Sequence, residues 1–215
     1  MWIVNLIPKS EKILVATTNP GKLRELSSML DIEVNWRSLS DFQQIRQIEE
    51  DQPTFALNAR KKAIGYSRLT GLWTIADDSG LMVDALDGAP GIKSARFSGA
   101  KSTDRSLLDY KNMAKLIQLL KDVPSPKRSC RFVCHLCLAD GEKILAETRG
   151  TLEGLIADEP KGTNGFGYDP VFFVPALQKT VAQLSSAEKN KISHRAKAIR
   201  KLKHILKELL GHTTG

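Results

Sequence analysis

The sequence predicts an α/β fold built on a mixed β-sheet, and two observations carry this prediction. The apolar run at residues 12–17 is typical of a central strand buried on both faces, and a helical pattern starts at Pro20. After Pro124 and Pro126, alternating segments joined at Asp140-Gly141 indicate antiparallel strands and a hairpin. Parallel and antiparallel parts of one sheet are therefore expected.

The remaining elements follow from periodicity and caps. The first helix has Asn19 as its expected cap and places Leu23, Leu26 and Leu30 on one stripe. The other expected elements, in chain order, are strand 32–36, helix 54–70, strand 73–77, helix 103–120, strands 128–139, 143–149 and 151–156, a strand ending at 174, and helix 194–210. The expected caps of the later helices are Thr54, Ser102 or Thr103, and Ser193, and Gly71 should end the second helix.

Length and composition suit a soluble globular protein. The chain has 215 residues, of which 41% are hydrophobic, so it can bury a sizeable core in one domain. No apolar run approaches the roughly 20 residues that span a bilayer, and residues 1–8 are too short for a signal-peptide core. A cytoplasmic location is expected.

Three cysteines, Cys130, Cys134 and Cys137, lie close together with His135. A zinc site is one interpretation. In a strand, however, Cys130 and Cys134 face one side while His135 and Cys137 face the other. Small core residues are the favoured interpretation, because a free cysteine packs as a small hydrophobe.

The net charge of +8 is concentrated at the C-terminus, where residues 179–215 carry nine Lys or Arg against two Glu. A basic helix can be a solvated face, a contact for nucleic acid, or a source of cations for a phosphorylated ligand. No specific nucleic-acid binding is expected here.

The segment Asp77-Asp78-Ser79-Gly80 follows a buried strand and is the strongest candidate for the catalytic floor. Adjacent carboxylates repel, so they need a cation, hydrogen-bond donors or a raised pKa. A divalent metal is the simplest answer, with Glu50 from the acidic run Glu49-Glu50-Asp51 as a second ligand. The alternative is a strand-to-turn junction at which Asp77 and Ser79 cap backbone groups.

Two further stretches suit a phosphorylated, ring-bearing ligand. Thr17-Thr18-Asn19-Pro20-Gly21-Lys22 lies between a strand end and a helix N-terminus, where anions bind, although a capped helix start with a surface lysine also explains it. The glycine-rich loop at residues 162–169 could let Phe166 stack on a base and Asp169 accept from a base or ribose. Alternatively, Phe166 plugs the core.

Six motifs in order resemble the inosine triphosphate pyrophosphatase family and cover residues 12–210. They are Thr17-x-Asn19-x-x-Lys22, Thr54-Phe55-x-x-Asn58-Ala59-x-x-Lys62-Ala63, Ala76-Asp77-Asp78-Ser79-Gly80-Leu81, Gly88-Ala89-Pro90-Gly91-Ile92-x-Ser94-Ala95-Arg96, Asn164-Gly165-Phe166-Gly167-Tyr168-Asp169-Pro170 and Ser193-His194-Arg195. The resemblance implies two α/β lobes around a long mixed sheet with the active site in the cleft between them. It places one domain at residues 12–211, with an extension at 1–11 and a tail at 212–215, and implies a homodimer.

The resemblance also implies a reaction and its residues. Non-standard purine nucleoside triphosphates (XTP, ITP, dITP) would be hydrolysed to the monophosphate and pyrophosphate, with Mg²⁺ held by Glu50 and Asp78 and with Asp78 as the base for water. The residues implied to bind substrate are Thr17, Thr18, Asn19, Pro20, Gly21, Lys22, Lys62, Ser79, Phe166, Gly167, Tyr168, Asp169, Lys189, His194 and Arg195. Asp77 would give support.

Two residues depart from the family pattern. Leu57 stands where many relatives carry Glu, which removes any metal or water contact from that position, and Thr18 replaces a common glycine in the phosphate loop. A receiver-like module, in which acidic pairs at strand ends also bind magnesium, is a competing hypothesis. It predicts regularly alternating strands and helices, which the hairpin at Asp140-Gly141 opposes.

Overall fold

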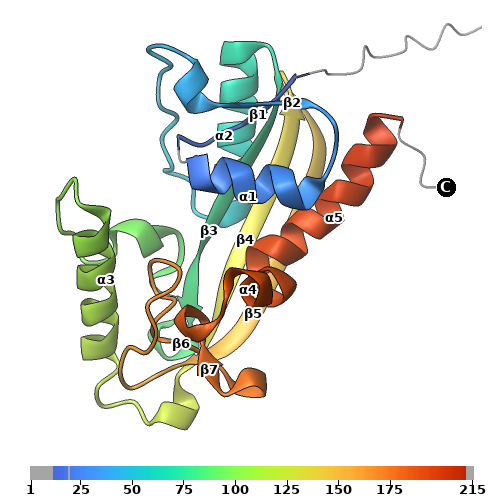
Figure 1. The fold of residues 1–215 in the computed structure, drawn as a ribbon. Coiled ribbons are helices and arrows are strands. Elements are labelled where there is room, and N and C mark those ends of the chain that lie inside the picture. Colours follow the sequence, from blue (N-terminus) through green and yellow to red (C-terminus); the bar gives the residue numbers. More distant parts are fainter. Residues whose placement is uncertain (1–11, 19, 212–215) are drawn as a thin grey trace, which may run out of the picture.

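One seven-stranded mixed sheet runs through the molecule. The computed structural model describes residues 12–18 and 20–211, so the expectations for residues 1–11, Asn19 and residues 212–215 lie outside it. The sheet order is β2-β1-β3-β4-β5-β6-β7 (Figure 1). The strands are β1 Lys12–Val15, β2 Asn35–Ser38, β3 Trp73–Val83, β4 Ser129–Asp140, β5 Lys143–Ile156, β6 Phe172–Val174 and β7 Lys179–Thr180.

The sheet has a parallel and an antiparallel half, as the sequence predicts. β1 pairs in parallel with β2 and β3, whereas every pair from β3 to β7 is antiparallel. The antiparallel half contradicts a receiver-like arrangement. The fold is therefore the expected mixed α/β type.

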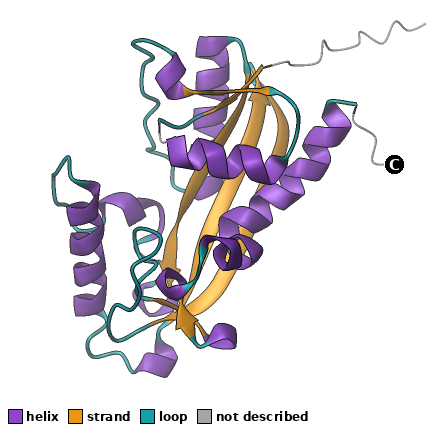
Figure 2. Ribbon diagram, in the orientation of Figure 1, coloured by secondary structure: helices purple, strands orange, loops and turns teal. Residues whose placement is uncertain are grey.

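The described part of the chain contains five α-helices (Figure 2). They are α1 Pro20–Leu30, α2 Phe55–Thr70, α3 Arg105–Leu119, α4 Ser186–Ile192 and α5 His194–Leu209. Strand alternation separates their contacts: Ile75 and Leu136 pack with α1 and α5, whereas Ala76 and Cys137 pack with α2. No helix in the described part is long and apolar enough to cross a membrane.

The two lobes have separate hydrophobic clusters that share β3 and β4. Ile75 lies in the cluster with α1 and α5, while Leu81 and Val83 lie in a second cluster with Leu116 of α3 and Phe172 of β6. The middle of β3 thus crosses from one lobe to the other. Asp77 to Gly80 occupy this crossing.

The strand predicted to end at residue 77 continues to Val83, so the alternative of a strand-to-turn junction at Asp77-Asp78-Ser79-Gly80 is wrong. Each of the four residues has a partner in β4, with Asp78 opposite His135. Gly80 permits the close packing, since an added Cβ would lie 2.5 Å from Ser94 Oγ. Small polar residues here form an interior strand.

Other element boundaries differ from those predicted, because more than one nearby residue could cap a helix or begin a strand. The cap of α3 is Asp104, whose side chain accepts from Ser106 N at 2.9 Å and Leu107 N at 3.4 Å, and the expected caps Ser102 and Thr103 precede it. The second strand lies three residues later than predicted at its start, and α4 was not predicted. The caps Thr54 and Ser193 and the left-handed Gly71 are confirmed.

The cysteines are buried core residues, as the strand pattern favours. Cys130 and Cys134 face the clusters that contain α3 and α5, and Cys137 faces α2. Burial raises the pKa of Cys137 to about 12. This thiol therefore stays protonated at neutral pH.

Helix α5 lies directly on β5 at Gly150. A Cβ on Gly150 would meet the carbonyl oxygen of His194 at 2.0 Å and Ala198 N at 2.7 Å, both backbone atoms that cannot swing away. The Thr148 hydroxyl donates to the Ala198 carbonyl at 2.9 Å and joins the same two elements. Only glycine fits between them.

We expect Gly150→Ala to lower the free energy of unfolding by about 3 kcal/mol, the upper end of the cost of an overpacked core. Gly65→Ala in α2 is the matched control, because its Cβ meets only the flexible Ile48 side chain and alanine favours the helix. Urea denaturation measures both. Equal stabilities of the two variants would contradict the packing described here.

Candidate active site

A cavity of about 800 Å³ opens where the two lobes meet. It gathers residues from the end of β1, from α2, β3 and α3, from the glycine-rich loop and from the start of α5. The predicted site residues that line it are Thr17, Thr18, Glu50, Lys62, Asp78, Ser79, Phe166, Gly167, Tyr168, Asp169, Lys189, His194 and Arg195. Residues far apart in sequence thus meet at one place.

The predicted phosphate loop is only partly described. Thr17 and Thr18 line the cavity at the end of β1, and α1 begins at Pro20 with its N-terminus directly after them. Asn19 lies outside the described residues, and so do the side chains of Pro20, Gly21 and Lys22. Their contacts with a ligand remain predictions.

Asp78 forms the buried floor of the cavity, with 7% of its surface exposed. Its Oδ1 accepts from Ser79 N at 3.0 Å, and its buried Oδ2 has no described donor within hydrogen-bonding distance, although the nearby Asn58 side chain lowers the pKa of this carboxyl. Burial raises the pKa of Asp78 to about 6, the charge of Lys62 opposes the rise, and Glu50 adds to it. Asp78 is therefore a carboxylate that lacks a full set of partners.

Lys62 supplies the nearest positive charge from α2. Its Nζ donates to Glu50 Oε1 and to the carbonyl oxygen of Asp77, both at 2.5 Å. Burial by itself would lower the pKa of Lys62, but the charges of Asp77 and Glu50 outweigh it and raise the pKa. The ammonium thus stays charged inside the site.

Asp77 points to the opposite face of β3 from Asp78 and has its own partners. Arg195 Nη2 lies 3.6 Å from Asp77 Oδ2, and the Ser79 hydroxyl donates to the same oxygen at 3.3 Å. Asp77 thus fixes the start of α5 beside the floor. This geometry suits the supporting role expected for it.

The residues present fit a magnesium ion. Asp78 Oδ2 is a buried acceptor that has no donor in the part of the chain that the structure describes, and Glu50 lies beside Lys62 in the same cavity. In the described part, no three His, Cys, Asp or Glu side chains gather to hold a metal by themselves. Mg²⁺ commonly uses one or two carboxylates and takes its other ligands from water and substrate phosphates.

The glycine-rich loop presents Phe166 to the cavity, and the core-plug interpretation of Phe166 is wrong. Phe166 is 50% exposed, and its ring has Lys189 Nζ at 4.9 Å and the Arg195 guanidinium at 5.8 Å. Tyr168 takes the buried position, and its hydroxyl donates to the Ser94 carbonyl at 3.0 Å. An exposed aromatic flanked by cations suits a stacked ring with negative groups attached.

Asp169 serves the loop itself. Its buried Oδ2 accepts from Phe166 N at 3.0 Å and from Lys189 Nζ at 2.5 Å. These two bonds occupy one oxygen of the side chain that was predicted to accept from a base or ribose. Asp169 therefore shapes the Phe166 loop and holds Lys189 over it.

His194 is a neutral side chain at the start of α5. Its ring stacks on Phe132 at 4.9 Å, and its buried Nδ1 has no hydrogen-bond partner among the described residues. Burial, followed by the charges of Arg195 and Lys189, lowers its pKa to about 3. Its imidazole is thus uncharged at neutral pH.

Two charged residues of the lining, Arg105 and Asp109 of α3, were not predicted from the sequence. Asp109 Oδ2 accepts from Gly167 N at 2.8 Å, and Arg105 Nε pairs with Asp109 Oδ1 at 3.1 Å. Their spacing of four residues indicates a helical ion pair. Nothing local indicates that the pair faces a loop 58 residues away.

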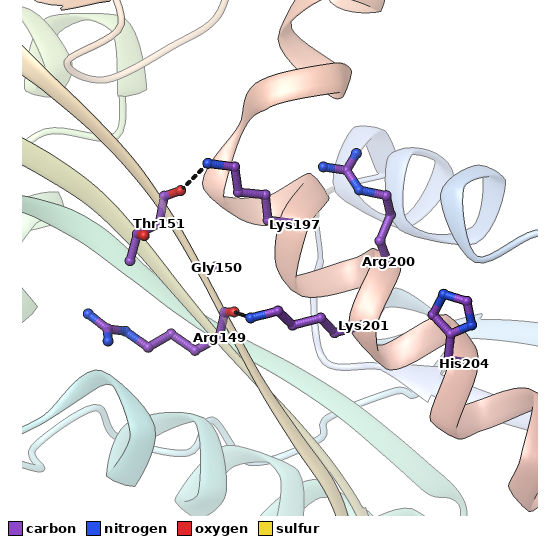
Figure 3. A pocket seen from close by; sticks show the side chains of 7 residues that line it. All are labelled: Arg149, Gly150, Thr151, Lys197, Arg200, Lys201 and His204. Carbon is purple, nitrogen blue, oxygen red and sulfur yellow. Dashed lines mark hydrogen bonds between the residues drawn. The ribbon is translucent and has the colours of Figure 1, made fainter.

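A smaller hollow of about 420 Å³ lies between α5 and β5 (Figure 3). Lys197 and Lys201 donate across it to the carbonyl oxygens of Thr151 and Arg149, each at 2.8 Å. These lysines cover backbone acceptors of β5, which protects that stretch of strand from pairing. The larger cavity, with Asp78 at its floor, is therefore the candidate active site.

The fold and the cavity together define a class of protein, the α/β enzymes that act on phosphorylated small molecules. Within that class, the chain belongs to the Ham1 family, whose family model matches residues 13–205. The family resemblance inferred from the six motifs is confirmed.

Relatives and solved structures match nearly the whole chain. A dITP/XTP pyrophosphatase of Bacillus cereus is 45% identical, covering 92% of this chain and 96% of the relative, and one of Desulforamulus reducens is 44% identical, covering 94% and 98%. The structure of a HAM1 protein from Coxiella burnetii matches with a TM-score of 0.83 at 39% identity, and that of the Staphylococcus aureus Ham1 protein with 0.82 at 38%. Each covers 92% of this chain and 98% of its own.

The raised pKa of Asp78 predicts a pH-dependent stability difference. The folded protein binds this proton more tightly than the unfolded chain, whose pKa is 3.8, so ionised Asp78 costs stability as pH rises through about 6. In EDTA, Asp78→Asn should match the wild type at pH 4 and be more stable by about 3 kcal/mol at pH 7.5.

Urea denaturation at both pH values measures this difference. Asp122→Asn is the control, because the Asp122 side chain is 88% exposed. A stability gain of Asp78→Asn that is the same at pH 4 and pH 7.5 would contradict the raised pKa.

Proposed function

We propose that the protein is a magnesium-dependent nucleoside triphosphate pyrophosphatase that hydrolyses XTP, ITP and dITP to the monophosphate and pyrophosphate. The proposed role is to remove non-standard purine nucleotides from the nucleotide pool. The observation that carries it is buried Asp78, whose Oδ2 has no donor among the described residues, at the floor of a cavity that also presents exposed Phe166. The 45% identity to a dITP/XTP pyrophosphatase supports the same assignment.

Glu50 and Asp78 are the proposed magnesium ligands. The ion, when bound, would neutralise phosphate charge and polarise the phosphorus that is attacked. Lys62 holds Glu50 in place through its 2.5 Å hydrogen bond and adds positive charge near the phosphates. Leu57 is 36% exposed and offers no carboxylate of its own, so the proposed ligand set does not include it.

Asp78 is the proposed general base. Without a bound ion, a pKa of about 6 leaves Asp78 mostly ionised at neutral pH, so its carboxylate is in the form that accepts a proton from water. The water oxygen forms a bond to the α-phosphorus, the α-β phosphoanhydride bond breaks, and pyrophosphate leaves with the bonding electrons. Phosphoryl transfer of this kind depends on positioning and charge neutralisation.

The triphosphate is proposed to lie along the end of β1. Thr17, Thr18 and the N-terminus of α1 present hydroxyl and amide donors there, and a helix N-terminus favours an anion. Lys22 is assigned by its motif alone. Ser79, next to the floor, is proposed to contact the substrate.

The base is proposed to stack on Phe166 beside His194 and Arg195. Neutral His194 lines the cavity, and its ring nitrogen Nδ1 has no partner among the described residues. A site that bonds a 6-oxo base leaves a buried group unpaired when a 6-amino base enters, and this favours ITP and XTP over ATP. A homodimer and a cytoplasmic location complete the proposal.

Product analysis tests the reaction. With Mg²⁺, ITP and XTP should give pyrophosphate and monophosphate, ATP should react far more slowly, and EDTA should stop turnover. Asp78→Asn should lower kcat at least about a hundredfold, because general-base catalysis contributes about 10²–10⁴-fold. Orthophosphate as the product, equal turnover of ATP, or full activity of a folded Asp78→Asn protein would overturn the assignment.

Phe166→Ala should raise KM for ITP about tenfold with little change in kcat, since stacking of one base contributes about 1–3 kcal/mol. Phe166→Trp should keep the aromatic surface and remain close to the wild type. Tyr110→Ala removes another exposed aromatic, 64% exposed on α3 outside the cavity, and serves as the control. Steady-state kinetics with ITP measure these effects. If Phe166→Ala and Tyr110→Ala behaved alike, the proposal that the base stacks on Phe166 would be rejected.

A further inference from the structure

The conformation of the glycine-rich loop needs anchors, because its glycines give it little preference of its own. Gly165 and Gly167 have φ values of +80° and +63°, and Phe166 lies between them. Asn164 N donates to the Ala182 carbonyl at 3.0 Å, and Phe166 N donates to Asp169 Oδ2 at 3.0 Å. These bonds tie the loop to the chain that follows it.

Asp109 ties the loop to α3, on another side of the cavity. Its Oδ2 accepts from Gly167 N at 2.8 Å, and Figure 1 shows the loop, in orange, beside α3. The Asp109 side chain is only 14% exposed, so the carboxylate is shielded from water. A charge-assisted hydrogen bond of this kind is stronger than a neutral one.

Arg105 orients the carboxylate of Asp109. Arg105 Nε lies 3.1 Å from Asp109 Oδ1, one helical turn earlier, which leaves Oδ2 directed at Gly167. Among the described residues, each carboxylate oxygen of Asp109 therefore has a partner. Buried Tyr168 follows Gly167 and bonds the Ser94 carbonyl, so the loop is held at two successive residues.

We propose that Asp109 is a positioning residue for Phe166, the ring on which the purine base is proposed to stack. By holding the Gly167 amide, Asp109 fixes Phe166 so that it faces the cavity. Asp109 acts on the substrate through the loop and does not touch the reacting phosphates. The inference rests on the proposed function, because it assigns to that site a residue that governs binding of the purine ring. Its effect is expected in substrate affinity and not in the chemical step.

Kinetics of Asp109→Ala separate this role from a general structural one. KM for ITP should rise about tenfold, the effect of losing a hydrogen bond to a charged group, while kcat stays within about threefold. Asp109→Asn keeps an oxygen that can accept from Gly167 N and should restore KM to within about threefold of the wild type. Asp122→Ala, an exposed acid beyond the end of α3, should change nothing.

Amide hydrogen exchange at Gly167 in the nucleotide-free protein gives a readout that does not need activity. Exchange should be at least about tenfold faster in Asp109→Ala than in the wild type and near the wild-type rate in Asp109→Asn. Unchanged exchange, a fall in kcat with unchanged KM, or an Asp109→Asn variant as impaired as Asp109→Ala would overturn the inference. Failure of the proposed function would instead show as wild-type protein inactive on ITP with the exchange pattern intact.

Discussion

The cavity depends on the buried ammonium group of Lys62. It bonds the side chain of Glu50 and the backbone carbonyl of Asp77, and its charge lowers the pKa of Asp78 against the effect of burial. Without this cation, the two acidic side chains would face each other in a site of low polarity, where like charges cannot both stay ionised at little cost. Lys62 therefore allows several carboxylates to lie close together in a site where a metal ion and phosphates are proposed to bind.

The pleat of β3 gives the adjacent carboxylates different surroundings. Asp78 faces α2 and Lys62, while Asp77 faces the start of α5, where Arg195 meets it. The two lobes share this strand, so any change in how they pack is transmitted to the floor of the cavity. The glycine-rich loop places Phe166 in the same cavity, where it faces these charged side chains.

Much of the fold could be predicted from local patterns. Thr54 and Gly71 bound α2, and the Asp140-Gly141 hairpin follows β4, because caps and turns use chemistry within a few residues. The Asp77–Gly80 strand was missed because small polar residues favour turns unless a partner strand pairs with them. The motifs located most of the cavity lining, but they did not distinguish exposed Phe166 from buried Tyr168 or reveal Asp109, since those facts depend on contacts between distant segments.

The central claim is that water attacks the α-phosphorus of the substrate and releases pyrophosphate. Hydrolysis of ITP in water enriched in ¹⁸O, followed by mass spectrometry of both products, tests it directly. One labelled oxygen should appear in the monophosphate and none in the pyrophosphate. Label in the pyrophosphate would mean that the β-phosphorus is attacked and would contradict the account.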